Sequence, residues 1–162
     1  MLIREAKIED LKEIFAIYNE EVLSGIATFD TEPVNEVDQL SWFNKRDRKH
    51  PVLVGELEGR VVAWGSLNPY SPRKAYDLTA TGSIYVHKDF QGKGYGKKIL
   101  LALIEEARKR GLRAILALIA AENEGSLKLH LKCGFQKVGE LKKVGFKFGR
   151  WLDVVILEYL LF

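Results

Sequence analysis

The sequence predicts a single α/β domain with a mixed, mostly antiparallel sheet flanked by helices, in the order βααβββαβαββ. Stretches with apolar residues three or four positions apart alternate with short runs rich in β-branched and aromatic residues. No repeat, low-complexity segment or linker interrupts them. The chain has 162 residues, of which 47% are hydrophobic, which is enough for one core but too few for two ordinary domains. We therefore expect one domain spanning residues 1–162.

The first part of the chain is expected to form a strand and two helices. Residues 2–4 are short and apolar, as in an edge strand. Apolar residues then recur at helical spacing between positions 11 and 22, which predicts an amphipathic helix. Asn35 is placed to cap a second helix. The side chains expected on the inner side of this second helix are Val37, Leu40 and Phe43 or Trp42.

The middle of the chain predicts three strands. Residues 51–57 and 60–67 are both β-rich, and only Glu58 and Gly59 separate them, which indicates a tight hairpin. Residues 68–74 contain two prolines and polar residues and are expected to form a loop. A third strand should run from about residue 77 to residue 86, directly before a glycine-rich stretch.

The last part predicts two helices and three strands. A single apolar stripe over residues 97–110, followed by Gly111, is typical of a helix. Residues 114–119 are apolar throughout, as expected of a strand covered on both faces. A short helix over 126–132 ends at Gly134. Residues 135–143 and 151–160 supply the last two strands, and we expect a turn region at 145–149 to join them.

The glycine-rich stretch, residues 91–96, suits the binding of a phosphate group. A strand that leads through glycines into a helix directs unpaired backbone N–H groups at one point, where the helix dipole adds positive potential. Gly92, Gly94 and Gly96 allow close approach of the backbone, and Lys93 and Lys97 add charge. The spacing is neither that of a P-loop nor that of a dinucleotide fingerprint. By itself the pattern also fits a flexible turn at the start of a helix.

The stretch resembles the pyrophosphate loop of the GNAT family of N-acetyltransferases, whose pattern Q/R-x-x-G-x-G/A is matched by Gln91, Gly94 and Gly96. The resemblance extends over nearly the whole chain and is greatest to the phosphinothricin and methionine sulfoximine N-acetyltransferase branch. The segments similar to this branch are Ile17-Tyr18-Asn19, Thr31-Glu32-Pro33, Ser83-Ile84-Tyr85-Val86, Leu129-His130 and residues 145–153. The resemblance implies a GNAT-like domain, acetyl-CoA as co-substrate without a metal, and a small amino acid or analogue as acceptor of the acetyl group.

The resemblance also implies the binding residues. Those expected at acetyl-CoA are Ile84, Tyr85, Val86, Gly92, Lys93, Gly94, Tyr95, Gly96, Lys97 and Asn123. Those expected at the acceptor are Lys74, Tyr76 and Phe29, together with Thr28 and the turn at 147–151. A cation in this acceptor pocket could bind the carboxylate of an amino acid.

Direct transfer of the acetyl group needs a hydrogen-bond donor to the developing oxyanion, a proton for the departing thiolate and a base that takes a proton from the amine. The backbone N–H near Val86 is expected to be the oxyanion donor. His130 occupies the branch's histidine position and could protonate the thiolate, although a purely structural hydrogen bond fits it equally well. The branch's strand glutamate is replaced by Thr81, which cannot take up a proton at neutral pH.

Without the glutamate, the proton of the amine could leave by two routes. A water chain could suffice, or Glu122, Asp77 or His87 could relay it. If the family mechanism holds, Thr81→Glu should raise turnover. The alternative to both proton routes is that the protein is a weakly catalytic CoA-binding module.

The sequence also allows other acceptors of the acetyl group and other binding partners. A protein N-terminus, a polyamine or an aminoglycoside are alternative acceptors. Nucleic-acid binding through the basic tail is not expected, because Leu141, Val144 and Phe146 interrupt it in strand-like alternation. Dimers are common in the branch that the chain resembles, and the exposed aromatic residues expected near Phe148 and Trp151 make a homodimer plausible.

Composition indicates a cytoplasmic protein that does not act at a membrane. The formal charge of +3 is mild. No apolar run reaches the ~20 residues that a spanning helix needs, and we recognise no secretion signal in the first residues. The one cysteine, Cys133, fits a reducing compartment and is expected at a helix end, half-buried.

Overall fold

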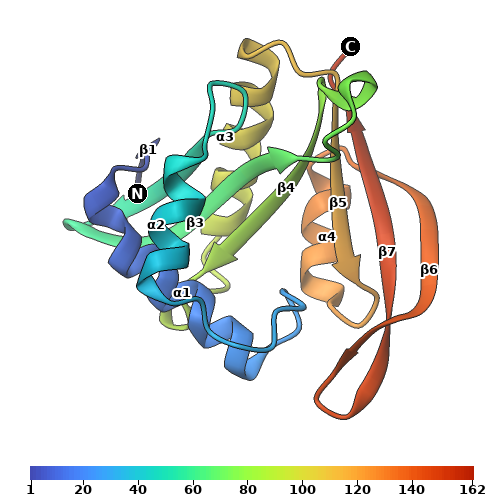
Figure 1. Ribbon diagram of the computed structural model, residues 1–162, viewed down its shortest axis with the longest axis horizontal. Coiled ribbons are helices and arrows are strands. Elements are labelled where there is room, and N and C mark those ends of the chain that lie inside the picture. The colour runs from blue at the N-terminus through green and yellow to red at the C-terminus, as the bar shows by residue number, and fades with distance from the viewer.

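A seven-stranded sheet runs through the molecule in the order β1-β2-β3-β4-β5-β7-β6 (Figure 1). The computed structural model describes residues 1–162. The strands are β1 (Leu2–Glu5), β2 (Val52–Leu57), β3 (Arg60–Pro69), β4 (Thr79–Val86), β5 (Ala114–Ala120), β6 (Gln136–Lys147) and β7 (Arg150–Leu160). Neighbouring strands are antiparallel except for the parallel pair β4 and β5. The predicted mixed, mostly antiparallel sheet is confirmed.

Four helices cover the two faces of the sheet, and the predicted element order is confirmed. They are α1 (Leu11–Ser24), α2 (Glu36–Asn44), α3 (Tyr95–Lys109) and α4 (Glu124–Lys132). The face with α1 and α2 has a core that includes Trp64 of β3. The other face, with α3 and α4, has a larger core that includes the neighbouring residue Ala63. Successive side chains of a strand point to opposite faces, so β3 contributes to both cores.

The helix α3 lies unusually close to β3, and a glycine makes this possible. Ile99, Leu100 and Leu103 of α3 are fully buried. A Cβ atom on Gly65 would lie only 2.7 Å from a methyl group of Ile99 and 2.9 Å from the carbonyl oxygen of Ser83. Close packing at this point fixes where α3 begins relative to the end of β4.

The second predicted helix forms, but its inner side differs from the prediction. Asn35 caps α2 by accepting a hydrogen bond from the backbone N–H of Asp38, as expected. Val37 and Leu40, predicted to face inward, are exposed. Trp42 and Phe43, of which one was predicted to face inward, both pack against the α1 core. The helix is short and contacts the domain near its C-terminal end, so only its last residues reach the core.

Strands β4 and β5 are paired over only three residues and then diverge (Figure 1). The last pair joins Thr81 to Leu116. Beyond it the rest of β4 has no partner on the β5 side. Leu118 of β5 is half-exposed as a result, so the prediction that residues 114–119 are covered on both faces was wrong at this position. The gap between the two strands is where a ligand can reach the backbone of β4.

The hairpin of β6 and β7 is longer than predicted. Residues 145–147 belong to β6, and the turn consists of Phe148 and Gly149, both with positive φ. The predicted turn region at 145–149 was therefore too wide. The hairpin projects beyond the body of the sheet in Figure 1. None of the helices combines the length and apolar character that crossing a membrane requires.

Candidate active site

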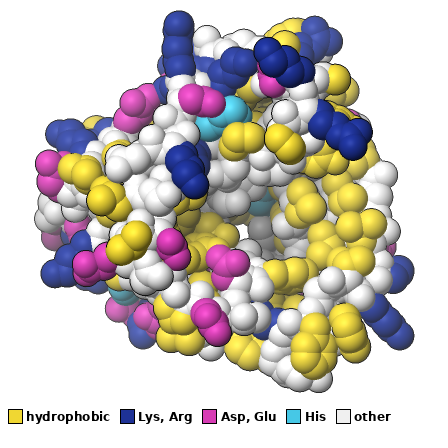
Figure 2. All heavy atoms as spheres, viewed as in Figure 1, with side chains coloured by type: hydrophobic (Ala, Val, Ile, Leu, Met, Phe, Trp, Pro, Cys, Tyr) yellow, Lys and Arg dark blue, Asp and Glu magenta, His cyan; other side chains and the backbone are white.

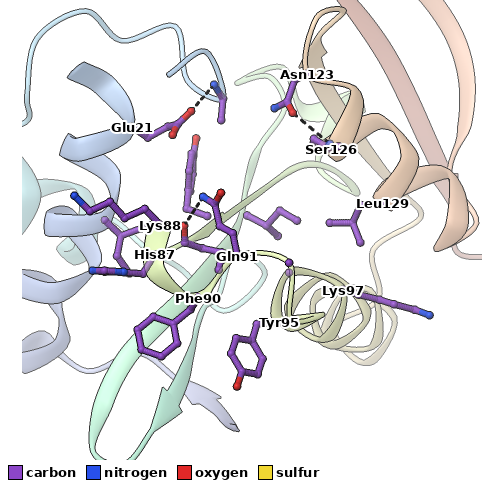
Figure 3. A pocket seen from close by; sticks show the side chains of 18 of the residues that line it. Glu21, His87, Lys88, Phe90, Gln91, Tyr95, Lys97, Asn123, Ser126 and Leu129 are labelled. Atoms are coloured by element: carbon purple, nitrogen blue, oxygen red, sulfur yellow. Dashed lines mark hydrogen bonds between the residues drawn. The ribbon is translucent and has the colours of Figure 1, made fainter. Parts of the chain in front are cut away.

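A cavity of about 640 Å³ opens at the end of β4, next to the start of α3 (Figure 3). Its walls come from α1, the end of β4, the glycine-rich loop, and the first turns of α3 and α4. The residues that line it are Ile17, Glu20, Glu21, Ser24, Ala27, Ile84, Tyr85, Val86, His87, Lys88, Phe90, Gln91, Gly92, Gly94, Tyr95, Gly96, Lys97, Asn123, Gly125, Ser126 and Leu129. We call it the cofactor cavity.

The glycine-rich loop ends in a helix N-terminus with free donors. Gly94 is the N-cap of α3 and has φ 83°, a left-handed conformation that glycine adopts without strain. No side chain caps this helix end. The backbone N–H groups of Tyr95, Gly96 and Lys97 donate to no acceptor in the protein. Such a helix end binds an anion such as a pyrophosphate, so the residues present fit the phosphate groups of acetyl-CoA.

Nine of the ten residues predicted at the cofactor line this cavity, and Lys93 does not. The Nζ atom of Lys93 lies 5.3 Å from the centre of the Phe90 ring instead. Lys97 lies at the rim, with its side chain directed away from the cavity in Figure 3. The free donors at this end of the cavity are therefore the backbone amides more than these ammonium groups.

The end of β4 offers a free backbone donor at the mouth of the gap. The N–H of His87 donates to the carbonyl oxygen of Val62, so residue 87 faces β3. Backbone groups alternate in direction along a strand, so the N–H and C=O of Val86 face the gap. The side chain of Gln91 donates to the Val86 oxygen at 3.1 Å. The Val86 N–H has no partner, because the pairing of β4 with β5 ends at Thr81. A free N–H held in a strand is a suitable donor for a developing oxyanion.

Asn123 stands at the opposite wall, at the start of α4 (Figure 3). Its Oδ1 atom accepts a hydrogen bond from the backbone N–H of Ser126. This capping bond turns the amide so that its NH₂ group remains available to a ligand carbonyl.

Sequence reasoning missed the wall contributed by α1. Glu20 forms an ion pair with Lys88 at 2.8 Å, and Glu21 accepts a hydrogen bond from the N–H of Ala27. Both glutamates occupy polar positions of an amphipathic helix, where charged residues ordinarily face solvent. No pattern in the sequence distinguishes them, because α1 is brought to the loop only by the fold.

His130 lies under the gap, where it lines a small cavity with Ser83, Ile84 and Leu118. It is buried, and its Nδ1 lies 2.8 Å from the carbonyl oxygen of Ser126. Because a carbonyl oxygen only accepts, Nδ1 carries a hydrogen and Nε2 is the free acceptor of the neutral ring. Burial lowers the pKa of His130 below its ordinary value of 6.5. At neutral pH this histidine can give a proton to a thiolate only after it has taken one up.

A third cavity, of about 200 Å³, lies on the α1 face of β3 and β4, and we call it the aromatic cavity. Its lining residues are Phe15, Tyr18, Asp30, Val34, Trp42, Trp64, Ser66, Asn68, Ser83 and Tyr85. Tyr85 also lines the cofactor cavity. The two cavities therefore share the side chain of Tyr85 as a common wall near the end of β4.

The lining of the aromatic cavity includes hydrogen-bond donors that the protein does not use. The indole N–H of Trp64 is buried without a partner. Ser66 accepts a hydrogen bond from the amide of Asn68, so its own hydroxyl hydrogen is free to donate. Arg46 donates to the Oδ1 atom of Asn68 at 2.8 Å and so fixes the direction of that amide. A ligand with accepting oxygens would satisfy these donors.

The structure does not bring the three predicted acceptor residues into any of the three cavities described above. Lys74 and Tyr76 are exposed on a short 3₁₀ turn near the start of β4, where Tyr76 contacts Tyr70. Phe29 lies against Gly145 of the hairpin. Thr81 lies at the last β4–β5 pair and lines none of the cavities described above. These four roles remain predictions.

Three features lie beside one cavity: a strand that diverges from its parallel neighbour, a free strand N–H and an uncapped helix end. Together they are typical of an acyltransferase that uses a CoA thioester. The chain belongs to the Acetyltransferase (GNAT) family, whose model matches residues 9–135. It is an N-acetyltransferase, and acetyl-CoA is its co-substrate.

Three known proteins show how similar the relatives are. The chain is 39% identical over 158 residues to an L-methionine sulfoximine/L-methionine sulfone acetyltransferase of Pseudomonas aeruginosa, covering 96% of this chain and 92% of that one. It is 37% identical to a phosphinothricin N-acetyltransferase of Alcaligenes faecalis, covering 96% and 80%. An acetyltransferase structure from Salmonella typhimurium with acetyl-CoA superposes with a TM-score of 0.97 at 37% identity, covering 100% and 94%. The predicted family and branch are confirmed.

Proposed function

We propose that the protein acetylates the α-amino group of a small amino acid whose side chain bears oxygen, as methionine sulfoximine, methionine sulfone and phosphinothricin do. The observation that carries this proposal is the aromatic cavity, which is separated from the cofactor cavity by no more than the shared lining residue Tyr85. Its size suits a single amino acid side chain. The names of the relatives agree with this class of acceptor.

In this proposal the cofactor cavity holds acetyl-CoA along its whole length. The N–H groups of residues 95–97 bind the pyrophosphate, and the amide of Asn123 donates to the pantetheine arm. The gap beside Ile84 and Val86 receives the thioester, where the free N–H of Val86 stabilises the oxyanion. His130 takes a proton from the attacking nitrogen and passes it to the sulfur.

The test of the proposed function is an acceptor panel that measures thiol release from acetyl-CoA. Methionine sulfone, methionine sulfoximine and phosphinothricin should each give an acceptor-dependent rate. A polyamine, an aminoglycoside and a peptide N-terminus should give none. Tight acetyl-CoA binding without any acceptor-dependent rate would instead identify a CoA-binding module.

Ser66→Ala is expected to reduce the preference for an oxygen-bearing side chain. Methionine sulfone and methionine differ only in the two oxygens on sulfur. Loss of one hydrogen bond of about 1 kcal/mol should lower the ratio of their kcat/KM values about fivefold. Ser41→Ala, in α2 and outside the lining of the cavity, serves as the control. An equal loss for both substrates would show that Ser66 only supports the fold.

We also propose that the protein is a cytoplasmic homodimer. The β6–β7 hairpin exposes a group of apolar side chains, including the Phe146 and Trp151 rings, whose centres lie 5.0 Å apart. Hydrophobic side chains gather on the hairpin side of the molecule in Figure 2. Cys133 is buried rather than half-buried as predicted. A single cysteine that forms no intramolecular disulfide supports the cytoplasmic location in this proposal.

Trp151→Lys is expected to produce a monomer. A charge placed in an apolar interface would have to be desolvated on association. Light scattering coupled to size exclusion should give the mass of a dimer for the wild type and of a monomer for the variant. Val37→Lys, at another exposed apolar site, on α2, should leave the dimer intact. A monomeric wild type would contradict the proposal.

A further inference from the structure

Strand β4 carries no acid where the acceptor amine must lose its proton. Thr81 occupies the last paired position of β4, and an alcohol does not accept a proton at neutral pH. The three alternatives considered from the sequence are engaged elsewhere. Glu122 forms an ion pair with Arg150 at 2.8 Å, and the ring nitrogens of His87 contact Arg60 and the N–H of Asp89. Asp77 follows the 3₁₀ turn at the far end of β4.

Asp30 is the single acidic residue that lines the aromatic cavity. It comes from the connection between α1 and α2, on the same side of the sheet as Thr81, Ser83 and Tyr85. A cavity of about 200 Å³ is only a few ångströms across, so an amine bound in it lies close to the Asp30 carboxylate, directly or through one water.

A hydrogen-bond network fixes the position of Asp30. The Tyr18 hydroxyl donates to the Oδ2 atom of Asp30 and lies 2.8 Å from the Thr28 hydroxyl. Because the one Tyr18 hydrogen goes to the carboxylate, the Thr28 hydroxyl donates to the Tyr18 oxygen. The backbone N–H of Asp30 donates to Thr28 Oγ1 at 3.2 Å. The Oδ1 atom of Asp30 has no partner in the protein and remains free to accept a proton.

Two further features keep this network in place. Burial raises the pKa of Tyr18 to about 12, so its hydroxyl remains a donor at neutral pH. The buried Lys147 donates from Nζ to the carbonyl oxygen of Thr28 at 2.8 Å, which ties the Asp30 segment to the β6–β7 hairpin.

We propose that Asp30 is the catalytic base, in the role that the branch assigns to a glutamate at position 81. This inference rests on the proposed function. The Asp30 carboxylate takes one proton from the acceptor ammonium and becomes a carboxylic acid. The neutral amine then forms the N–C bond to the thioester carbonyl carbon, and the C–S bond breaks. The second proton of the nitrogen goes to the departing sulfur, and Asp30 returns its proton to bulk water.

The test compares Asp30→Asn with the wild type across a range of pH. Asparagine keeps the size of the side chain and can still accept from Tyr18, but it cannot take up a proton. At neutral pH we expect kcat/KM for methionine sulfone to fall about 100-fold or more, with the Kd of acetyl-CoA unchanged. The loss should shrink as the pH rises towards the pKa of the acceptor amine, since the neutral amine then forms in solution.

A second variant moves the base back to the strand. Thr81→Glu in the Asp30→Asn background should restore most of the lost activity, because it places a carboxylate on the same face of β4. Glu36→Gln, in the exposed first turn of α2 and outside the three cavities, is the control for removal of a surface carboxylate, and it should keep full activity.

Three results would overturn the assignment of Asp30. These are an Asp30→Asn variant within twofold of the wild type, a loss of equal size at every pH, and a Thr81→Glu change that restores nothing. Failure of the proposed function is visible separately, because the wild type would then acetylate no amino acid.

Discussion

His130→Asn should lower kcat by about 10²- to 10⁴-fold, the contribution usual for a positioned acid–base group. The asparagine amide can still donate to the carbonyl oxygen of Ser126, so the bond that His130 makes through Nδ1 has a substitute. The acceptor at Nε2 is lost, and with it the group that we propose passes a proton to the leaving sulfur. Steady-state rates with methionine sulfone, together with the Kd of acetyl-CoA by calorimetry, measure the effect. The Kd should not change.

His50→Asn is the matched control for this substitution. His50 is also buried, and its Nδ1 contacts Asp47, but it lines none of the three cavities. Its replacement should leave kcat unchanged. A similar fall in kcat for both variants would mean that His130 acts through stability alone.

The His130 variant should also change how stability depends on pH. Burial places the folded-state pKa of His130 below the ordinary value of 6.5, so between these two values the unfolded chain binds more protons than the folded one. The free energy of unfolding is therefore highest above pH 6.5 and falls as the pH drops towards the folded-state pKa. Chemical denaturation above and below pH 6.5 should show a smaller fall in His130→Asn than in the wild type. The kcat of the wild type should fall only at lower pH, around and below the folded-state pKa of His130, because the proposed proton transfer needs the neutral ring in the folded enzyme.

Gly94→Ala is expected to raise the Kd of acetyl-CoA about 10- to 100-fold. A side chain at φ 83° costs about 1–2 kcal/mol, so the loop relaxes to another conformation. The N–H groups of residues 95–97 then no longer converge, and the pyrophosphate loses several donors at once. Calorimetric titration with acetyl-CoA measures the change.

Gly111→Ala separates backbone strain from ligand binding. Gly111 has φ 78°, and a Cβ atom there, as at Gly94, would meet nothing within 4 Å. The two variants should lose similar stability in thermal denaturation. Only Gly94→Ala should lose affinity, since Gly111 lies at the other end of α3. Equal affinities would refute the assignment of the loop as the pyrophosphate site.

Local sequence was sufficient where the information is carried by neighbouring residues. The Glu58-Gly59 hairpin, the Asn35 cap and the stripe of α3 depend on spacing within one element, and the structure contains each of them. The buried side of α2 was harder to predict from the sequence, because the angle at which α2 meets α1 decides which of its side chains are buried. The exposure of Leu118 was likewise not predictable from local sequence, because it depends on β4 diverging from β5 after residue 116.

The proposed acetyl-CoA site could be predicted from the sequence, whereas the proposed amino acid site is formed only by the tertiary structure. Residues 91–97 suit an anion because a strand, glycines and a helix start follow one another directly, so their backbone donors converge without help from distant segments. The aromatic cavity assembles side chains from α1, the α1–α2 connection, α2, β3 and β4, which are far apart in the chain. Asp30 and Ser83 become neighbours only when α1 packs on Trp64, and the buried area and shape of that contact are properties of the whole fold.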